Sequence, residues 1–200
     1  MELTNLINLI LIWLNRIAAL AGVVVLLVPL LSFRRLDQRA RQSSSGLLAG
    51  VLHWPYMIVM TILFVLAGVL LWKPVPVALT PPWQAVALIC GSCLYFPAIA
   101  MYLWGYKTLG EHLGLSTEFG ASMYVNHQLI QKGPYLCVLH PKYLRVMQAA
   151  TGALLIFRTW AMLKFAPLSL GIILRARREE SLLAQAFGEN WQAHKERLPA

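Results

Sequence analysis

The apolar residues of this chain fall into long uninterrupted runs rather than the short periodic patterns of soluble helices and strands. The runs cover residues 17–33, 47–72 and 83–104, and a shorter run at residues 6–14 precedes the first of them. A helix needs about 20 apolar residues to cross about 30 Å of hydrocarbon. Each long run therefore predicts a membrane-spanning helix, with the shorter run as an extension of the first helix or as an interfacial piece.

Two basic residues interrupt the last apolar stretch. Between Arg145 and Arg175 the chain is apolar apart from Arg158 and Lys164, and one straight span would bury both cations without partners, which is costly in lipid. A helical hairpin that turns near residues 158–164 avoids this cost. The pattern thus predicts an all-α, multi-pass membrane helix bundle of about five spans. Its last two spans form a helical hairpin, and a cytosolic helix follows at the C-terminus.

The composition excludes a soluble globular protein. Hydrophobic residues make up 58% of the 200 residues and charged residues only 12%, whereas soluble domains carry about 25% charged residues. The net charge of +9 would point to nucleic acid in a soluble protein, but the basic residues lie at the ends of the apolar runs. Membrane topology accounts for them better, so we expect the lipid bilayer as a partner and no nucleic acid.

The basic residues also predict an orientation. Cytoplasmic loops of membrane proteins are enriched in Lys and Arg, so the polar linker at residues 34–41, which holds four arginines, should face the cytoplasm. Alternation of the spans then places the N-terminus outside, and residues 105–145 and the C-terminus inside, where 13 of the 17 basic residues gather. A bacterial inner membrane and the endoplasmic reticulum both fit this pattern.

The three cysteines predict neither a disulfide framework nor a metal centre. Cys90 and Cys93 form a C-x-x-C pattern inside an apolar run that has no flanking His or acidic ligand. Small residues that pack a membrane helix explain this pair better than metal or redox chemistry does. We therefore expect no metal in this protein.

Two polar segments on the expected cytoplasmic side hold the candidate chemistry. The first covers residues 127–143, in which Gly133 and Pro134 predict a turn and Pro141 predicts a helix start. The residue before a proline is pushed out of the helical region, so His140 should be extended just ahead of that helix. A helix N-terminus suits a carboxylate or a phosphate. A loop that merely caps a membrane helix, with His140 hydrogen-bonded, explains the same residues.

The second polar segment covers residues 175–197. Its apolar residues recur at helical spacing, which predicts an amphipathic helix lying on the membrane or on the protein; they are Leu182, Leu183, Ala186, Phe187 and Trp191. Arg175 and Glu179 are four residues apart, which on a solvated helix gives a weak ion pair. Taken alone, this segment predicts a surface helix.

Together the two segments resemble a known family. The first reads H-x-L-[VI]-x-x-G-P-Y-x-x-x-x-H-P-x-Y from His127 to Tyr143, and the second reads R-x-x-x-E-E-x-x-L-x-x-x-F-G-x-x-[YW] from Arg175 to Trp191. This arrangement is similar to the isoprenylcysteine carboxyl methyltransferase family and its phospholipid methyltransferase relatives. The resemblance covers residues 127–197, roughly the C-terminal third of the chain.

The resemblance implies an integral membrane enzyme that uses S-adenosyl-L-methionine to methylate a lipophilic acceptor at the boundary between membrane and cytosol. The implied acceptor is a prenylcysteine-like carboxylate or another small hydrophobic carboxylate, held by Arg175 as the catalytic residue. Residues 1–104 would supply N-terminal transmembrane helices, and residues 105–200 the cofactor-binding core. The residues implied to bind the cofactor are His127, Gln128, Leu129, Ile130, Tyr135, His140, Pro141, Lys142, Tyr143 and Glu179.

The chain departs from the family pattern at four positions. Leu139 stands where the family usually has Arg before the His-Pro pair, and Arg145 stands where a Gly is often found. Leu136 replaces an Arg or an aromatic residue, and His194 replaces a Tyr. These departures leave two alternatives open: phospholipid amine N-methylation, in which Arg175 would hold a phosphate, and a non-enzymatic membrane partner protein with a degenerate pocket.

Overall fold

The computed structural model describes residues 2–43, 54–109 and 131–198. Every regular element in these ranges is a helix, so the expected all-α architecture is confirmed. The elements are α1 (Glu2–Ser43), α3 (Trp54–Leu70), α4 (Pro81–Leu109), the 3-10 helix η2 (Gly133–Leu136), α6 (Pro141–Phe157), α7 (Trp160–Ser169), α8 (Gly171–Phe187) and α9 (Glu189–Glu196).

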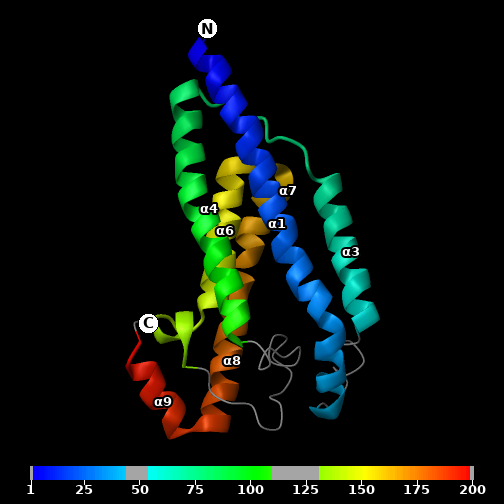
Figure 1. Cartoon of the computed structure of the whole chain (residues 1–200), viewed down its shortest axis with the longest axis vertical. Helices are drawn as coiled ribbons and strands as arrows, with labels where there is room; N and C mark the ends of the chain where they lie inside the picture. The colour runs from blue at the N-terminus through cyan, green and yellow to red at the C-terminus, as the bar shows by residue number, and fades with distance from the viewer. Residues whose placement is uncertain (1, 44–53, 110–130, 199–200) are drawn as a thin grey trace.

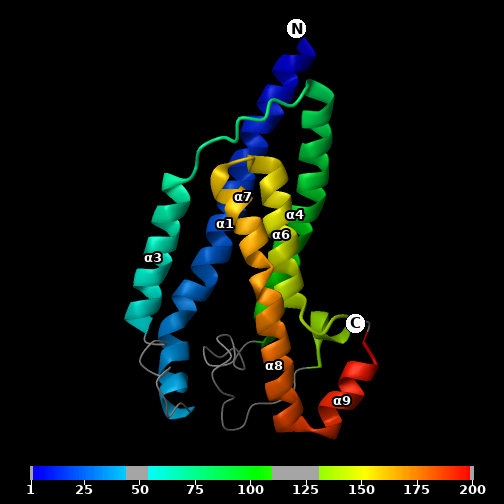
Figure 2. The same cartoon turned by 180° about the vertical axis from the view of Figure 1, so that it is seen from behind.

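The helices form an elongated bundle with two distinct ends (Figures 1 and 2). α4 packs against both α1 and α6, α3 flanks α1, and α7 runs back beside α6 and leads into α8. The N-terminus lies at one end of the bundle. η2, the start of α6, the end of α8 and α9 gather toward the opposite end. The described parts of the two polar segments therefore meet in space at one end of the bundle.

Among the residues that the structure describes, two helices are long and apolar enough to cross a membrane: Leu9–Val28 within α1 and Pro81–Thr108 within α4. α3 contains a shorter apolar stretch, Ile58–Leu70. Many large apolar side chains on α1 and α3 are exposed, as contact with lipid requires. These features indicate a membrane protein, while the count of five spans and the orientation of the chain stay predictions.

α1 is longer than the sequence pattern predicts. Residues 34–41, expected as a polar linker, continue the helix to Ser43, so the prediction of a linker was wrong. No Gly or Pro occurs between residues 30 and 43, and Arg, Leu, Gln and Ala are good helix formers. The helix therefore continues past its apolar part and ends on the side of the bundle opposite the N-terminus (Figure 1).

α4 and α6 approach each other closely because glycines lie at their crossing. A Cβ atom added at Gly152 of α6 would lie 2.7 Å from the backbone nitrogen of Tyr95, and one added at Gly91 of α4 would lie 3.0 Å from the carbonyl oxygen of Gly152. Small residues allow this approach in membrane helices, whose association depends on close packing. The crossing fixes the position of α6 and thus of the residues at its start.

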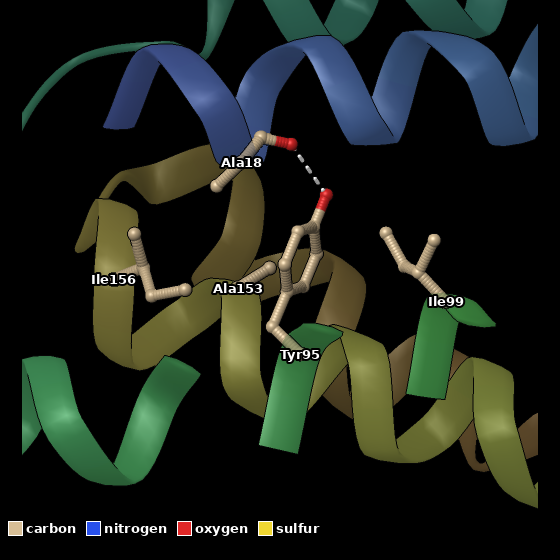
Figure 3. Close-up of a cluster of buried hydrophobic side chains, with 5 residues drawn as sticks. All are labelled: Ala18, Tyr95, Ile99, Ala153 and Ile156. Atoms are coloured by element: carbon tan, nitrogen blue, oxygen red, sulfur yellow. Dashed lines mark hydrogen bonds between the residues drawn. The ribbon is translucent and has the colours of Figure 1, made fainter. Parts of the chain in front are cut away.

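Tyr95 connects this helix pair to α1 (Figure 3). Its hydroxyl donates a hydrogen bond to the carbonyl oxygen of Ala18 at 2.8 Å. The ring lies in a buried cluster with Ile99, Ala153 and Ile156. An unpaired hydroxyl in such surroundings would be costly, so the hydrogen bond favours one position of α1 relative to α4.

The chain reverses direction after α6 at Arg158, whose φ of +48° lies in the left-handed region. The hydroxyl of Thr159 accepts a hydrogen bond from the N–H of Met162 and caps α7. The reversal lies within the predicted interval of residues 158–164. α7 is followed directly by α8, with only Leu170 between them. That α6 and α7 cross the membrane as a pair stays a prediction.

Candidate functional site

The local sequence positions the start of α6. η2 begins at Gly133, whose φ is +58°, and a Cβ atom there would lie 2.9 Å from the hydroxyl oxygen of Thr108 on α4. Pro141 is the first residue of α6, and His140 precedes it with a φ of −124° and a ψ of 63°. Proline suits the first helical position because no hydrogen-bond donor is needed there. The predicted turn and the predicted helix start are both confirmed.

A polar cluster of three side chains joins α6, α8 and α9. Nε2 of His140 lies 3.1 Å from Oε1 of Glu180, and the ammonium of Lys195 donates to Oε2 of Glu180 at 2.7 Å. The side chains of His140 and Glu180 are 16% and 26% exposed, whereas that of Lys195 is 43% exposed. Because an ionised carboxylate only accepts hydrogen bonds, Nε2 of His140 carries the proton in this contact.

Opposing effects act on the pKa of Glu180. Burial raises the pKa of its carboxyl, but hydrogen bonds from Lys195 and His140, together with electrostatic attraction to the Lys195 ammonium and the ring N–H of His140, lower it, and the net pKa lies below the ordinary value. The carboxyl of Glu180 is therefore ionised at neutral pH. It can hold both donors at the same time.

Tyr143 adds an aromatic surface beside this cluster. Its ring stacks on that of His140, with the ring centroids 5.6 Å apart and the planes inclined by 24°. Aromatic faces attract cations and pack against other rings. The start of α6 thus presents an imidazole and a phenol side by side.

Glu179 precedes Glu180 on α8 but has different surroundings. Its Oε2 is buried and has no hydrogen-bond partner among the described residues. On α6, Nε of Arg145 is also buried and unpartnered within the described ranges, while Nη1 of Arg145 donates to the side-chain oxygen of Gln148. Buried polar atoms nearly always have a partner, so a bound molecule with an N–H, O–H or cationic group would satisfy Glu179.

Comparison with known proteins identifies the family. The model of a family described as phospholipid methyltransferase matches residues 86–190, which is more than half of the chain. The chain belongs to the phospholipid methyltransferase family. This family is one of the isoprenylcysteine carboxyl methyltransferase-like membrane methyltransferases, so the resemblance found in the sequence is confirmed. Comparisons with curated proteins and with solved structures found no match.

The phospholipid methyltransferase match covers most of the polar cluster. It runs from α4 to the second residue of α9 and includes His140, Glu179 and Glu180. It ends before Lys195. Membership in the family supports methyl transfer to a lipid substrate associated with the membrane.

The structure describes several of the residues that the sequence predicts to bind a cofactor. Tyr135 lies in η2, while Pro141, Lys142 and Tyr143 form the first turn of α6. Pro141 is buried and the other three are half-buried. These residues and His140 therefore lie together next to the end of α4.

The other predicted residues are not placed in full. His127, Gln128, Leu129 and Ile130 lie outside the described residues. The backbone of Arg175 lies in α8, one turn before Glu179, but its side chain is not among those described.

The C-terminal segment differs from the single surface helix predicted for it. It forms α8 and α9, with a break at Gly188, whose φ of +49° favours glycine. Trp191 and His194 of α9 are buried, at 4% and 7% exposure. Burial lowers the pKa of the His194 imidazole, and the positive charge of Arg197 lowers it further. α9 is thus anchored to the protein by its own buried face.

Two members of the polar cluster were missed by sequence reasoning. Glu180 follows Glu179 directly, and adjacent helical residues point about 100° apart, so the sequence cannot decide which carboxylate faces α6. Lys195 is 15 residues further along the chain. Its only signal in the sequence is Gly188, which favours a helix break and so would allow the tail to fold back.

Proposed function

We propose that this protein is an S-adenosyl-L-methionine-dependent methyltransferase that methylates a carboxylate on a lipophilic acceptor, such as a prenylcysteine, at the boundary between membrane and cytosol. Residues 1–104 supply N-terminal membrane helices, and residues 105–200 supply the methyltransferase core. The observation that carries the proposal is the 3.1 Å contact between His140 and Glu180. It joins the two segments that carry the family motifs, although 40 residues separate its partners in sequence.

The described residues fit the proposed cofactor by their chemistry. S-adenosyl-L-methionine carries a sulfonium, an ammonium, a carboxylate and ribose hydroxyls, and when bound it supplies an activated methyl group. Oε2 of Glu179, which is buried and has no partner among the described residues, suits an ammonium or a hydroxyl donor. The first N–H groups of α6 have no partner within the helix, so they suit a carboxylate. The residues that would hold the cofactor are His127, Gln128, Leu129, Ile130, Tyr135, His140, Pro141, Lys142, Tyr143 and Glu179.

The contribution of the protein to this reaction is binding and orientation. An acceptor carboxylate is already a nucleophile, so its alignment in a site sheltered from water supplies most of the rate. Arg175 holds the acceptor carboxylate in this proposal, because a planar guanidinium binds a carboxylate through two hydrogen bonds and an ammonium does not. His140 and Tyr143 form one wall of the site, supported by their stacked rings.

Phospholipid amine N-methylation is the second candidate, and the description of the matching family favours it. Arg175 would then hold the lipid phosphate. An amine that is protonated at neutral pH must lose a proton before it can accept a methyl group. Nδ1 of His140, the ring nitrogen that does not contact Glu180, would be the candidate acceptor for that proton.

Calorimetric titration of the full-length protein in detergent with S-adenosylhomocysteine, the demethylated cofactor, tests the enzyme proposal. We expect binding, and we expect Glu179→Ala to weaken it at least tenfold, since a hydrogen bond to a charged group contributes about 1.5–3 kcal/mol. Glu189→Ala is the control, because Glu189 is an exposed carboxylate on α9. No heat with the wild-type protein would leave only the non-enzymatic partner protein.

Radioactive methyl transfer separates the two acceptors. The protein is incubated with labelled cofactor and either a prenylcysteine analogue or vesicles that contain phosphatidylethanolamine. A methyl ester releases labelled methanol in base, whereas a methylated amine keeps its label. We expect base-labile product from the prenylcysteine analogue, and base-stable product from the vesicles alone would instead establish the amine reaction.

Kinetics of a variant pair test the role of Arg175. Arg175→Ala should raise the KM for the acceptor and leave the affinity for S-adenosylhomocysteine within about twofold of wild type. Arg177→Ala, which removes an exposed arginine from the same helix, should change neither quantity. Equal losses in acceptor and cofactor binding with Arg175→Ala would refute the assignment.

A further inference from the structure

The C-terminal helix α9 carries Lys195, whose charged side chain is part of the polar cluster. The chain turns at Gly188, whose N–H still donates to the carbonyl of Ala184 at 3.0 Å and closes α8. The buried residues Trp191 and His194 hold α9 in place. Lys195 follows His194 directly and lies 2.7 Å from Oε2 of Glu180.

The two oxygens of Glu180 have different partners. The ammonium of Lys195 donates a hydrogen bond to Oε2, and Nε2 of His140 contacts Oε1. A carboxylate held at both oxygens cannot rotate freely without losing one of the two hydrogen bonds. Since Nε2 of His140 donates to Oε1, the neutral imidazole has its lone pair on Nδ1. The orientation of Glu180 therefore determines which nitrogen of His140 can accept a hydrogen bond.

We propose that Lys195 is a positioning residue that acts through Glu180 to hold His140 in the Nε2–H tautomer, which makes α9 part of the methyltransferase site. The argument for the cluster rests on geometry, and its link to cofactor binding rests on the function proposed above. Lys195 lies beyond the part of the chain that the family model matches. A purely structural role, in which Lys195 only fastens α9, predicts a loss of stability but no change at the imidazole.

Nitrogen NMR of the full-length protein labelled at histidine measures the tautomer of His140 directly, with His140→Gln used to assign its resonances. We expect the Nε2–H tautomer in the wild-type protein, a mixture of tautomers in Lys195→Met, and the wild-type pattern again in Lys195→Arg. Lys164→Ala, which removes an exposed lysine from α7, is the charge-matched control and should leave the spectrum unchanged. Lys195→Gln, which keeps a hydrogen-bond donor, serves if Lys195→Met fails to fold, and it should give a smaller shift in the same direction.

Binding of S-adenosylhomocysteine gives a second measurement. Lys195→Met should weaken binding about fivefold, Lys195→Arg should bind within about twofold of wild type, and the effects of Lys195→Met and Glu180→Gln should not add, because both act on one contact. A wild-type imidazole spectrum in Lys195→Met, or additive losses in the double variant, would overturn the proposal. Absence of binding to the wild-type protein would instead refute the proposed function, and the NMR result would still decide the role of Lys195.

Discussion

Gly152→Ala is the sharpest test of how the bundle positions its site. The added Cβ atom would lie 2.7 Å from the backbone nitrogen of Tyr95 and 2.8 Å from the carbonyl oxygen of Gly91. Both are backbone atoms within α4, so no side chain can rotate to make room. To restore ordinary contact distances of about 3.5 Å, α4 and α6 must move apart by roughly 0.8 Å.

The size of the effect follows from two opposing terms. Overpacking a close contact costs about 1–3 kcal/mol, while replacing Gly by Ala inside a helix contributes about 1 kcal/mol of helix propensity. At the centre of the overpacking range, the net loss at Gly152 is therefore about 1 kcal/mol. Gly68 is a matched control, because it also lies inside a helix, α3, and a Cβ atom there has nothing within 4 Å.

Thermal unfolding in detergent measures this difference. A loss of 1 kcal/mol lowers the melting temperature by about 2–4 °C for a chain of this size, so Gly152→Ala should melt several degrees below the wild-type protein, and Gly68→Ala at or above it. We also expect Gly152→Ala to weaken binding of S-adenosylhomocysteine, because α6 carries His140. Equal melting temperatures for the two variants would refute the close-packing argument.

Three further predictions concern stability and pH. Tyr95→Phe should lower the free energy of unfolding by about 0.5–1.5 kcal/mol, measured by denaturant titration in detergent, because it removes the hydrogen bond to Ala18; an unchanged value would contradict that bond. The folded pKa of His194 is lowered from 6.5, so protonation of its imidazole favours the unfolded chain. The melting temperature should therefore fall as the pH drops below about 6.5, and His194→Gln should weaken this pH dependence. The folded pKa of Glu180 is also lowered from 4.5, so the ionised carboxylate should stabilise the folded protein fully at neutral pH. This stabilisation should be lost as the pH falls below about 4.5, and Glu180→Gln should remove that acid-dependent loss.

The sequence could predict the features that depend on local physical chemistry. Helices follow from long apolar runs, the start of α6 follows from Pro141, and the turn at Gly133 follows from a residue that tolerates a positive φ. The reversal near Arg158 follows from the cost of placing cations in lipid. Each of these depends on a few neighbouring residues and on the solvent around them.

Other features could not be predicted in this way. The continuation of α1 through residues 34–41 depends on helix propensity overriding polarity, and a polar run is equally compatible with a loop. The close crossing of α4 and α6 depends on Gly91 and Gly152 meeting at one level, which requires the register of two helices that are far apart in sequence.

The sequence by itself determined that this chain is helical, that it belongs in lipid, and that its polar chemistry is concentrated in two segments with the motifs of a methyltransferase family. Only the tertiary structure decided which of the two adjacent carboxylates contacts His140. It also decided that Lys195 of the last helix donates a hydrogen bond to the same carboxylate. The physical reason is that composition and periodicity act along the chain, whereas a hydrogen bond of about 3 Å depends on the rotation and register of three separate helices.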